Sequence, residues 1–510
     1  MTTTTPSTAA DPAGSPPAGS RPAPSKALGT DNRPGRLLAV VIAAQFMALL
    51  DVFIVNVAAP TIRTELGASG AGLQLVIAGY TITYAVLLIT GARLGDRLGH
   101  RRVYLIGLAV FTVASLACGL SRGTGELIAF RLLQGAGSAL LIPQVLSLIQ
   151  HNFTGEARTR ALGAYAAVLA VGAAAGQVLG GVLVSADLFG TGWRPVFLVN
   201  VPVGVVLLIM AGRVLPRDAV RKSVAGERVA GEPVAGKPGP RARGLDLPGL
   251  VLLGGAVSLL TVPLVLGQEE GWPLWSWLSL GSAAVFFALF CAYESRLARG
   301  GGAPLIAPRV LRIPGMGLAV LRIAAVMAVN AGFLFVLTLH VQGGLGYSAL
   351  RAGLTFAPTA MVFGAVGLTW RRWPAALQRA LIPGGFALTA VSAVAVGLLL
   401  RDGGEGGPWL YAAFVGIGAG LSLGFSPTLT RALSTVRPED AADASGLLST
   451  VAQLGQLIGV ACFGALFLNR LESQGAPGAY SSAQALLVCA YALAGAAALG
   501  AVSGLVRLRR

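Results

Sequence analysis

Two side chains of opposite charge stand inside long apolar stretches of this 510-residue sequence. Asp51 lies in the stretch 37–56, and Arg131 lies in the stretch 124–149. A charge among apolar residues is costly unless it is paired, so such an acid is a candidate for binding a proton. If both side chains face one cavity, the arginine offsets part of that cost, and the acid gains a proton when the pair opens. The alternative is a static ion pair that only fixes helix packing.

The stretches around these charges are apolar runs of about 20 residues, long enough for a helix to cross a hydrocarbon core of about 30 Å. Of all residues, 55% are hydrophobic and 12% are charged, whereas soluble chains carry roughly 25% charged residues. Polar and apolar residues do not alternate along the runs, which argues against a β-barrel. We therefore predict an all-α polytopic membrane protein with fourteen transmembrane helices. The predicted spans are Leu37–Asn56, Ala71–Thr90, Val103–Leu120, Thr124–Ile149, Ala161–Ser185, Val196–Val214, Leu247–Leu266, Trp275–Tyr293, Met316–Val341, Leu350–Trp370, Ala380–Leu400, Trp409–Leu429, Gly446–Asn469 and Ala483–Val506.

The charges of the loops give these spans a direction. Of the 38 Lys and Arg residues, 30 lie in tails and loops on one side, 6 lie in loops on the other side, and Arg131 and Arg322 lie within spans. Basic residues gather on the cytoplasmic side of membrane proteins. We therefore expect a multi-pass protein of the cell (inner or plasma) membrane with both termini in the cytoplasm. Asp51 and Arg131 then lie at matching depth, roughly 10 Å below the outer surface at 1.5 Å per residue.

Two low-complexity segments stand apart from the apolar runs. Residues 1–36 are rich in Thr, Ser, Pro and Gly, and residues 215–245 carry a Val-Ala-Gly repeat that begins at Val224, Val229 and Val234. Such segments cannot bury a core. We predict a disordered cytoplasmic tail at 1–36 and a cytoplasmic loop at 215–245, which separates six spans from eight.

Two glycine-containing segments could control how helices approach and move. Small residues at a spacing of three or four line one stripe of the fifth span, against which a neighbour can pack closely. The loop 92–102 combines a glycine turn with one acid and several bases, and it is a candidate for a conformational contact. Ordinary packing and a positive-inside anchor are the alternatives. The residues concerned are Gly172, Gly176, Gly180 and Gly181 in the span, and Gly95, Asp96, Arg97, Gly99 and Arg101 in the loop.

Several uncharged polar residues within the spans could line a substrate cavity or, equally, bridge helices by hydrogen bonds. These candidates are Asn56, Tyr80, Tyr84, Gln134, Gln144, Gln177 and Asn330. Among the 21 acids, we expect only Asp51 well inside a span, with Glu126 and Asp246 at helix ends and the others in loops or tails. We expect His340 at the interface.

The chemistry of other protein classes is missing from the sequence. It has no P-loop and no His-Glu-x-x-His motif, and its three histidines make a multi-histidine metal site implausible. The net charge of +17 is scattered over short loops rather than gathered on one face, which argues against a nucleic-acid partner. We expect no enzymatic activity, no metal and no organic cofactor. The expected partners are a small-molecule substrate and membrane lipid, around a monomer.

The motifs taken together resemble the major facilitator superfamily, in particular its fourteen-span drug:proton antiporter branch. The likeness rests on the order of six segments. They are Leu50–Pro60 with Asp51 and Asn56, the loop ending at Arg102 with Ala92 where a Gly is usual, Arg131–Gly137, Gly172–Gly181 with Gln177 where the antiporter motif has Pro, and the segments Trp193–Pro202 and Ala444–Gly455.

This resemblance implies two six-helix bundles, at 37–214 and 295–510, with an inserted transmembrane hairpin at 246–294. It also implies alternating access around a midplane site. The implied activity is proton-coupled efflux of small organic molecules such as antibiotics, with the proton gradient as the energy source and Asp51 and Arg131 as the coupling residues. No acid is expected in spans nine to fourteen, so we expect substrates that are not dicationic. Proton-coupled uptake on the same fold is an alternative, and a membrane receptor or enzyme is a remoter one.

Overall fold

The computed structural model describes residues 33–216, 246–267, 270–302, 304–306, 308–437, 440–474 and 478–505, and every regular element among them is a helix. Residues 1–32 of the predicted tail and 217–245 of the predicted loop lie outside this range. The elements are α1 (Arg33–Leu66), α2 (Gly70–Leu98), α3 (His100–Leu120), α4 (Thr124–Asn152), α5 (Gly155–Ser185), η1 (Leu188–Gly190), α6 (Pro195–Leu198), α7 (Asn200–Val214), α8 (Leu247–Leu266), α9 (Leu274–Arg299), α10 (Pro308–Leu311), α11 (Met316–Thr338), η2 (Leu339–Gly344), α12 (Ala349–Thr369), η3 (Trp370–Arg372), α13 (Ala375–Leu400), α14 (Gly407–Ser434), α15 (Ala441–Glu472) and α16 (Ala479–Leu505).

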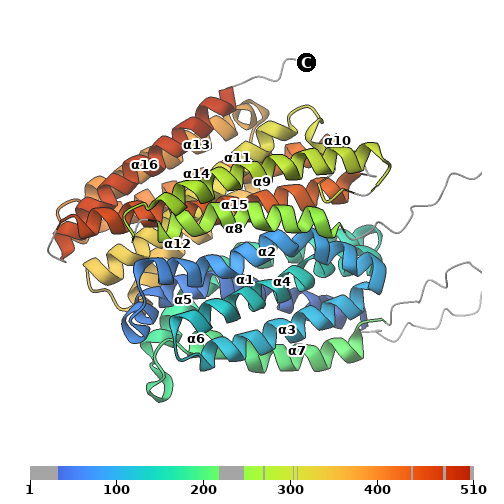
Figure 1. Cartoon of the computed structure of the whole chain (residues 1–510), viewed down its shortest axis with the longest axis horizontal. Coiled ribbons are helices and arrows are strands. Elements are labelled where there is room, and N and C mark those ends of the chain that lie inside the picture. The colour runs from blue at the N-terminus through green and yellow to red at the C-terminus, as the bar shows by residue number, and fades with distance from the viewer. Residues whose placement is uncertain are drawn as a thin grey trace, which may run out of the picture.

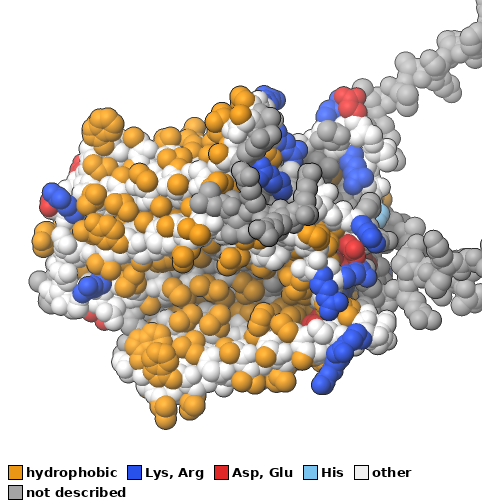
Figure 2. All heavy atoms as spheres, turned by 90° about the horizontal axis from the view of Figure 1, so that it is seen from above, with side chains coloured by type: hydrophobic (Ala, Val, Ile, Leu, Met, Phe, Trp, Pro, Cys, Tyr) orange, Lys and Arg blue, Asp and Glu red, His pale blue; other side chains and the backbone are white. Residues whose placement is uncertain are grey.

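In the described part, thirteen helices are long and apolar enough to cross a membrane. The helix α5, which contains the predicted fifth span, counts only as a shorter apolar segment at Ala175–Ser185. Figure 2 shows hydrophobic side chains spread along the flank of the molecule, with Lys and Arg gathered mainly at one end. Because a backbone in lipid must satisfy its own hydrogen bonds, apolar segments of this length fold as helices. The chain is therefore a multi-pass helical membrane protein.

Local chemistry sets where several of these helices begin and end. The side chain of Ser69 accepts a hydrogen bond from the amide of Gly72 at 3.0 Å and caps α2, and Ser348 caps α12 in the same way. Gly99 joins α2 to α3 with a φ of 95°, a conformation that favours glycine. These short caps and turns stack successive helices antiparallel.

The helices form two groups, and one helix pair lies against both (Figure 1). Helices α1 to α7 lie in one half of the view, and α11 to α16 lie in the other half. Between the groups, α8 packs against α9 and contacts both α2 of the first group and α15 of the second. Its apolar contacts include Leu253 and Val257 of α8 with Ala78 of α2 and Leu457 of α15. The helix α8, with α9 packed against it, therefore bridges the two groups.

The backbone of α5 lies very close to α1 and also to α12. A Cβ added at Gly176 would lie 3.0 Å from the carbonyl oxygen of Leu50, and one added at Gly180 would lie 3.0 Å from that of Ile54. On α12, a Cβ at Gly181 would lie 2.6 Å from the carbonyl oxygen of Ala349. Only glycine permits so close a backbone approach.

Hydrogen bonds join the two groups at the same end of the molecule. The amide of Leu350 donates to the hydroxyl of Ser185 at 3.0 Å, and the side chain of Gln342 donates to the carbonyl of Val57 at 2.9 Å. The loop charges predict that this is the outer end. The structure thus has the two groups in direct contact at this end.

Replacing Gly181 with Ala should force this end open. The added methyl group would overlap the backbone of α12, so we expect faster reaction of a Val184→Cys thiol with a membrane-impermeant maleimide, in a chain whose four native cysteines are changed to alanine. Gly317→Ala is the matched control, because a Cβ at Gly317 would meet no atom within 4 Å. Equal labelling rates in the two variants would contradict the expected contact.

Candidate functional site

The carboxylate of Asp51 is fully buried on α1 and accepts hydrogen bonds from three side chains. Arg131 of α4 donates to Oδ2 at 2.7 Å, while Gln134 of α4 and Asn200 of α7 each donate to Oδ1 at 2.8 Å. Hydrogen bonds to a charged acceptor are among the stronger ones in proteins. The pair that the sequence placed at matching depth is therefore in direct contact, and two amides support it.

The guanidinium of Arg131 is held by the neighbouring helix α2. Its Nε donates to the carbonyl of Val76 at 3.1 Å, and its Cζ lies 4.7 Å from the ring centroid of Tyr80. The hydroxyl of Tyr80 in turn donates to Ser138 at 2.8 Å. The backbone contact and the cation–π contact add to the ion pair with Asp51 in positioning the arginine.

Gln134 extends the network to a further helix. Its Nε2 donates both to Asp51 and to the hydroxyl of Ser115 on α3, each at 2.8 Å, and its Oε1 accepts from Arg131 at 2.6 Å. The network therefore joins α1, α2, α3, α4 and α7. Asn200 was not among the residues that the sequence singled out for the site, although an amide in an apolar run was a usable signal.

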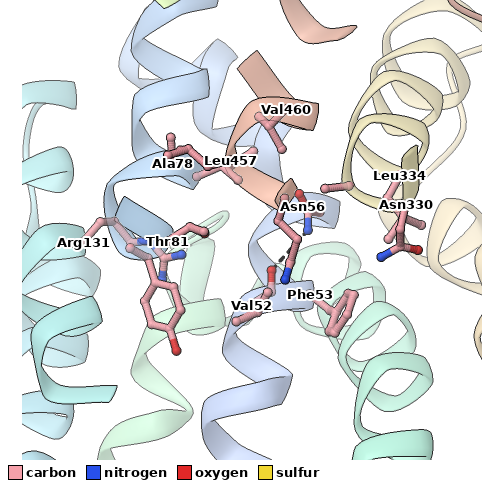
Figure 3. A pocket seen from close by; sticks show the side chains of 14 residues that line it. Val52, Phe53, Asn56, Ala78, Thr81, Arg131, Asn330, Leu334, Leu457 and Val460 are labelled. Atoms are coloured by element: carbon pink, nitrogen blue, oxygen red, sulfur yellow. Dashed lines mark hydrogen bonds between the residues drawn. The ribbon is translucent and has the colours of Figure 1, made fainter. Parts of the chain in front are cut away.

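A small cavity lies beside this network, between the two groups of helices. Its volume is about 30 Å³, which leaves room for about one water molecule. Arg131 forms part of its wall, whereas Asp51, which contacts Arg131, does not. Figure 3 shows Asn56 between Arg131 on one side and Asn330 of α11 on the other. The lining residues are Val52, Phe53, Asn56, Ile77, Ala78, Tyr80, Thr81, Arg131, Asn330, Ala331, Leu334, Gln456, Leu457 and Val460.

Three of the polar residues proposed for a cavity lie neither at its wall nor in the network of Asp51. Tyr84 is buried beside Tyr80, with 6.0 Å between ring centroids. Gln144 donates to the carbonyl of Gly91 at 2.9 Å and so joins α4 to α2. Gln177 is buried on α5, and both polar atoms of its amide lack a hydrogen-bond partner. The structure thus brings Asn56, Tyr80 and Asn330 together at the cavity, and it places Gln134 in the network of Asp51.

The segment 92–102, expected as a loop, forms the end of α2, the Gly99 turn and the start of α3. Its residues have two kinds of environment. A Cβ at Gly95 would lie 2.0 Å from the side-chain oxygen of Gln144, so α2 and α4 pack tightly here. Arg101 donates to the carbonyl of Gly212 at 2.8 Å and ties this turn to α7. By contrast, Asp96 and Arg97 are exposed, and Asp96 lies 3.8 Å from His100.

Two expectations about titratable residues were wrong. Glu294 lies inside α9, which continues to Arg299, and it is buried rather than in a loop. The predicted span ended at the first charged residue, but a buried carboxylate with a backbone partner is compatible with a continuing helix. His340 is fully buried rather than interfacial, because η2 turns it into the protein, where its Nδ1 lies 2.9 Å from the hydroxyl of Ser482.

A bundle of apolar helices with a buried acid–arginine pair beside a central cavity has the architecture of a membrane transporter. The chain belongs to the Major Facilitator Superfamily, whose sequence profile matches residues 41–460. It is 37% identical over 447 residues to a probable actinorhodin transporter of Streptomyces coelicolor, which covers 86% of this chain and 73% of that protein. It is 39% identical over 440 residues to a cephamycin export protein of Amycolatopsis lactamdurans, which covers 83% of each.

Solved structures support the same fold. A bacterial homolog of the human lysosomal transporter Spinster, captured inward-facing and unoccupied, matches with a TM-score of 0.65. The alignment covers 93% of this chain and 97% of that one, at 18% sequence identity. The likeness at this identity concerns the fold alone.

Replacing Arg131 with Gln should destabilise the protein far more than replacing a surface arginine. Removing one partner of a buried ion pair costs about 3–5 kcal/mol because the other charge stays buried. We expect the double variant Asp51→Asn/Arg131→Gln to be more stable than Arg131→Gln alone, measured as the midpoint of thermal unfolding in detergent. Arg160→Gln is the control, because its ion pair with Glu156 is exposed. A double variant as unstable as the sum of both single variants would show that the two charges are not coupled.

Proposed function

We propose that this protein exports small organic molecules such as antibiotics across the bacterial inner membrane, in exchange for protons. The support for export comes from relatives that cover most of the chain and are named as antibiotic transporters or exporters. The observation that carries the proton coupling is the buried Asp51–Arg131 pair beside a cavity lined by both groups of helices. On this proposal the chain is a transporter and not an enzyme, and it needs no metal or organic cofactor.

We also propose the full membrane topology that the sequence predicts. With α5 counted as a span, the thirteen candidate helices become fourteen. An even number of spans places both termini on the cytoplasmic side. The two groups are then the six-helix bundles 37–214 and 295–510, and the pair α8–α9 is the inserted hairpin. Because the transport site lies within one chain, a monomer suffices.

In the proposed cycle, a proton from outside binds Asp51 and weakens its attraction to Arg131. The neutral acid no longer needs the guanidinium, so Arg131 can turn toward the cavity, where it already forms part of the wall. Cytosolic substrate then enters the inward-facing state, and the proton leaves toward the cytoplasm as the ion pair forms again. One carboxylate in this network implies one proton for each cycle.

The glycine contacts and the small cavity support the interpretation that the protein is closed at its outer end and has no room for a substrate. The outer ends of α5 and α12 are in backbone contact, and the cavity holds only about 30 Å³. A drug-sized molecule needs at least about 300 Å³. Substrate entry therefore requires the bundles to separate on the cytoplasmic side, and release requires the contact between α5 and α12 to break.

Asp51→Asn should abolish the coupling between protons and substrate. In proteoliposomes with an imposed pH gradient, we expect the variant to lose concentrative export, because an amide at this position cannot carry a proton. The variant should still allow substrate to equilibrate across the membrane, which separates lost coupling from failed folding. If the Asp51→Asn variant still accumulated substrate at the wild-type level under the pH gradient, the proposed mechanism would be contradicted.

The charge of the substrates should follow from the charges of the protein. Among the described residues, the cavity wall carries Arg131 and no acid. We therefore expect a host that carries the gene to resist neutral, zwitterionic or anionic compounds and not dicationic dyes. The measurement compares minimal inhibitory concentrations with and without the gene. Resistance to a dicationic dye that disappears on deletion of the gene would contradict this expectation.

A further inference from the structure

Two buried acids meet at the end of the helix pair α8–α9 where the loop charges predict the cytoplasm. Asp246 directly precedes α8, and its side chain caps that helix, whereas Glu294 lies in the last turns of α9. They are 6% and 2% exposed. Neither belongs to the network around Asp51, and the proposed transport cycle does not use them.

Each of these acids has one oxygen engaged and one oxygen free. Asp246 Oδ1 accepts from the amide of Gly249, and Glu294 Oε2 accepts from the amide of Ile306, each at 2.9 Å. The other two oxygens, Asp246 Oδ2 and Glu294 Oε1, are buried and have no hydrogen-bond partner. Buried polar atoms without a partner are rare, and a proton or a bound ion is what such a pair of oxygens requires.

The two free oxygens converge on one point. Each lies 2.5 Å from the position that a Cβ on Gly249 would occupy, so they are at most about 5 Å apart. Two ionised carboxylates at this separation repel one another strongly where water is largely excluded. One proton removes that repulsion and supplies the missing donor for both oxygens.

Three neighbouring groups complete the electrostatic surroundings. The positive charge of Arg93 on α2 favours the ionised form of Glu294. The side chain of Arg93 also donates a hydrogen bond to the carbonyl of Pro304, two residues before Ile306, whose amide donates to Glu294. Tyr293 and Cys291 lie on α9, beside Asp246 and Glu294 respectively. Arg93 is thus a cation whose charge reaches the pair.

The donor set suits a proton better than a metal ion. A calcium ion takes six to eight oxygen ligands, and a magnesium ion demands six in a regular octahedron. The pair offers only two free oxygens, and no group of three or more potential metal ligands exists in the described part of the chain.

We propose that Asp246 and Glu294 bind one shared proton and form a second, cytoplasmic protonation site that fastens the pair α8–α9 to both bundles. With the proton bound, Glu294 holds the amide of Ile306, and Asp246 caps α8. Without the proton, the two charges repel, and Glu294 is drawn toward Arg93 on α2. Because α8 contacts α2 and α15, the protonation state changes how firmly the two bundles are linked on this side. The site senses cytoplasmic pH independently of Asp51.

The test uses full-length Asp51→Asn protein in lipid, so that its outcome does not depend on the proposed transport mechanism. Infrared difference spectra across a pH titration should show a protonated-carboxyl stretch that disappears as the pH rises. Both Glu294→Gln and Asp246→Asn should lose this band, since either change removes the shared proton. Glu156→Gln, which changes an exposed acid, and Tyr293→Phe should keep it.

A second measurement follows the mechanical consequence. Hydrogen exchange of residues 246–256 and 300–310 should become faster as the pH rises beyond the general dependence seen in control peptides. In Glu294→Gln, the amide side chain can still accept from Ile306, so this additional acceleration should be absent. A carboxyl band that persists in both acid variants would overturn the proposal. So would a band that sodium chloride removes at constant pH, because the site would then hold a sodium ion.

Discussion

The buried charge of Asp51 is the constraint around which the first bundle is arranged. A carboxylate without contact to solvent must be neutralised by its surroundings, and here helices α4 and α7 supply all three donors. Arg131 is itself positioned by α2, and Gln134 is positioned by α3. Any change in the charge of Asp51 therefore reaches five helices at once. This is the property that a proton needs in order to act on the shape of a whole bundle.

Much of this site could be predicted from the sequence, because charges in lipid are rare and depth follows from counting residues. Asp51 and Arg131 stood out among apolar neighbours, and their equal depth predicted their contact. The third donor, Asn200, was missed. Its amide in an apolar run marked it as unusual, but nothing in the spacing shows which way its side chain faces, and 149 residues separate it from Asp51. Gln144 was misleading for a related reason: an amide that lines a cavity and one that joins two helices look alike in sequence.

The fold could be predicted from the sequence to a similar extent. Apolar runs located the helices closely, and the bundle order followed from the resemblance. The helix ends were less accurate wherever a charged residue continued a helix, as at Glu294 in α9. The close backbone contacts between helices could not be predicted from the sequence either. The spacing of Gly180 and Gly181 indicated a smooth stripe, but it could not show that these neighbours face different bundles, Gly180 toward α1 and Gly181 toward α12.

Both bundles line the cavity, but only the first bundle contains the Asp51 network, and this difference affects how the two functions can evolve. The Asp51 network lies entirely within α1 to α7, whereas Asn330, Leu334, Gln456 and Val460 come from α11 and α15 of the second bundle. Mutations in this second set can reshape the wall without touching a hydrogen bond of the network. Proton coupling and substrate specificity can then evolve independently. Related transporters can thus evolve to export new compounds while they keep the same proton-coupling network.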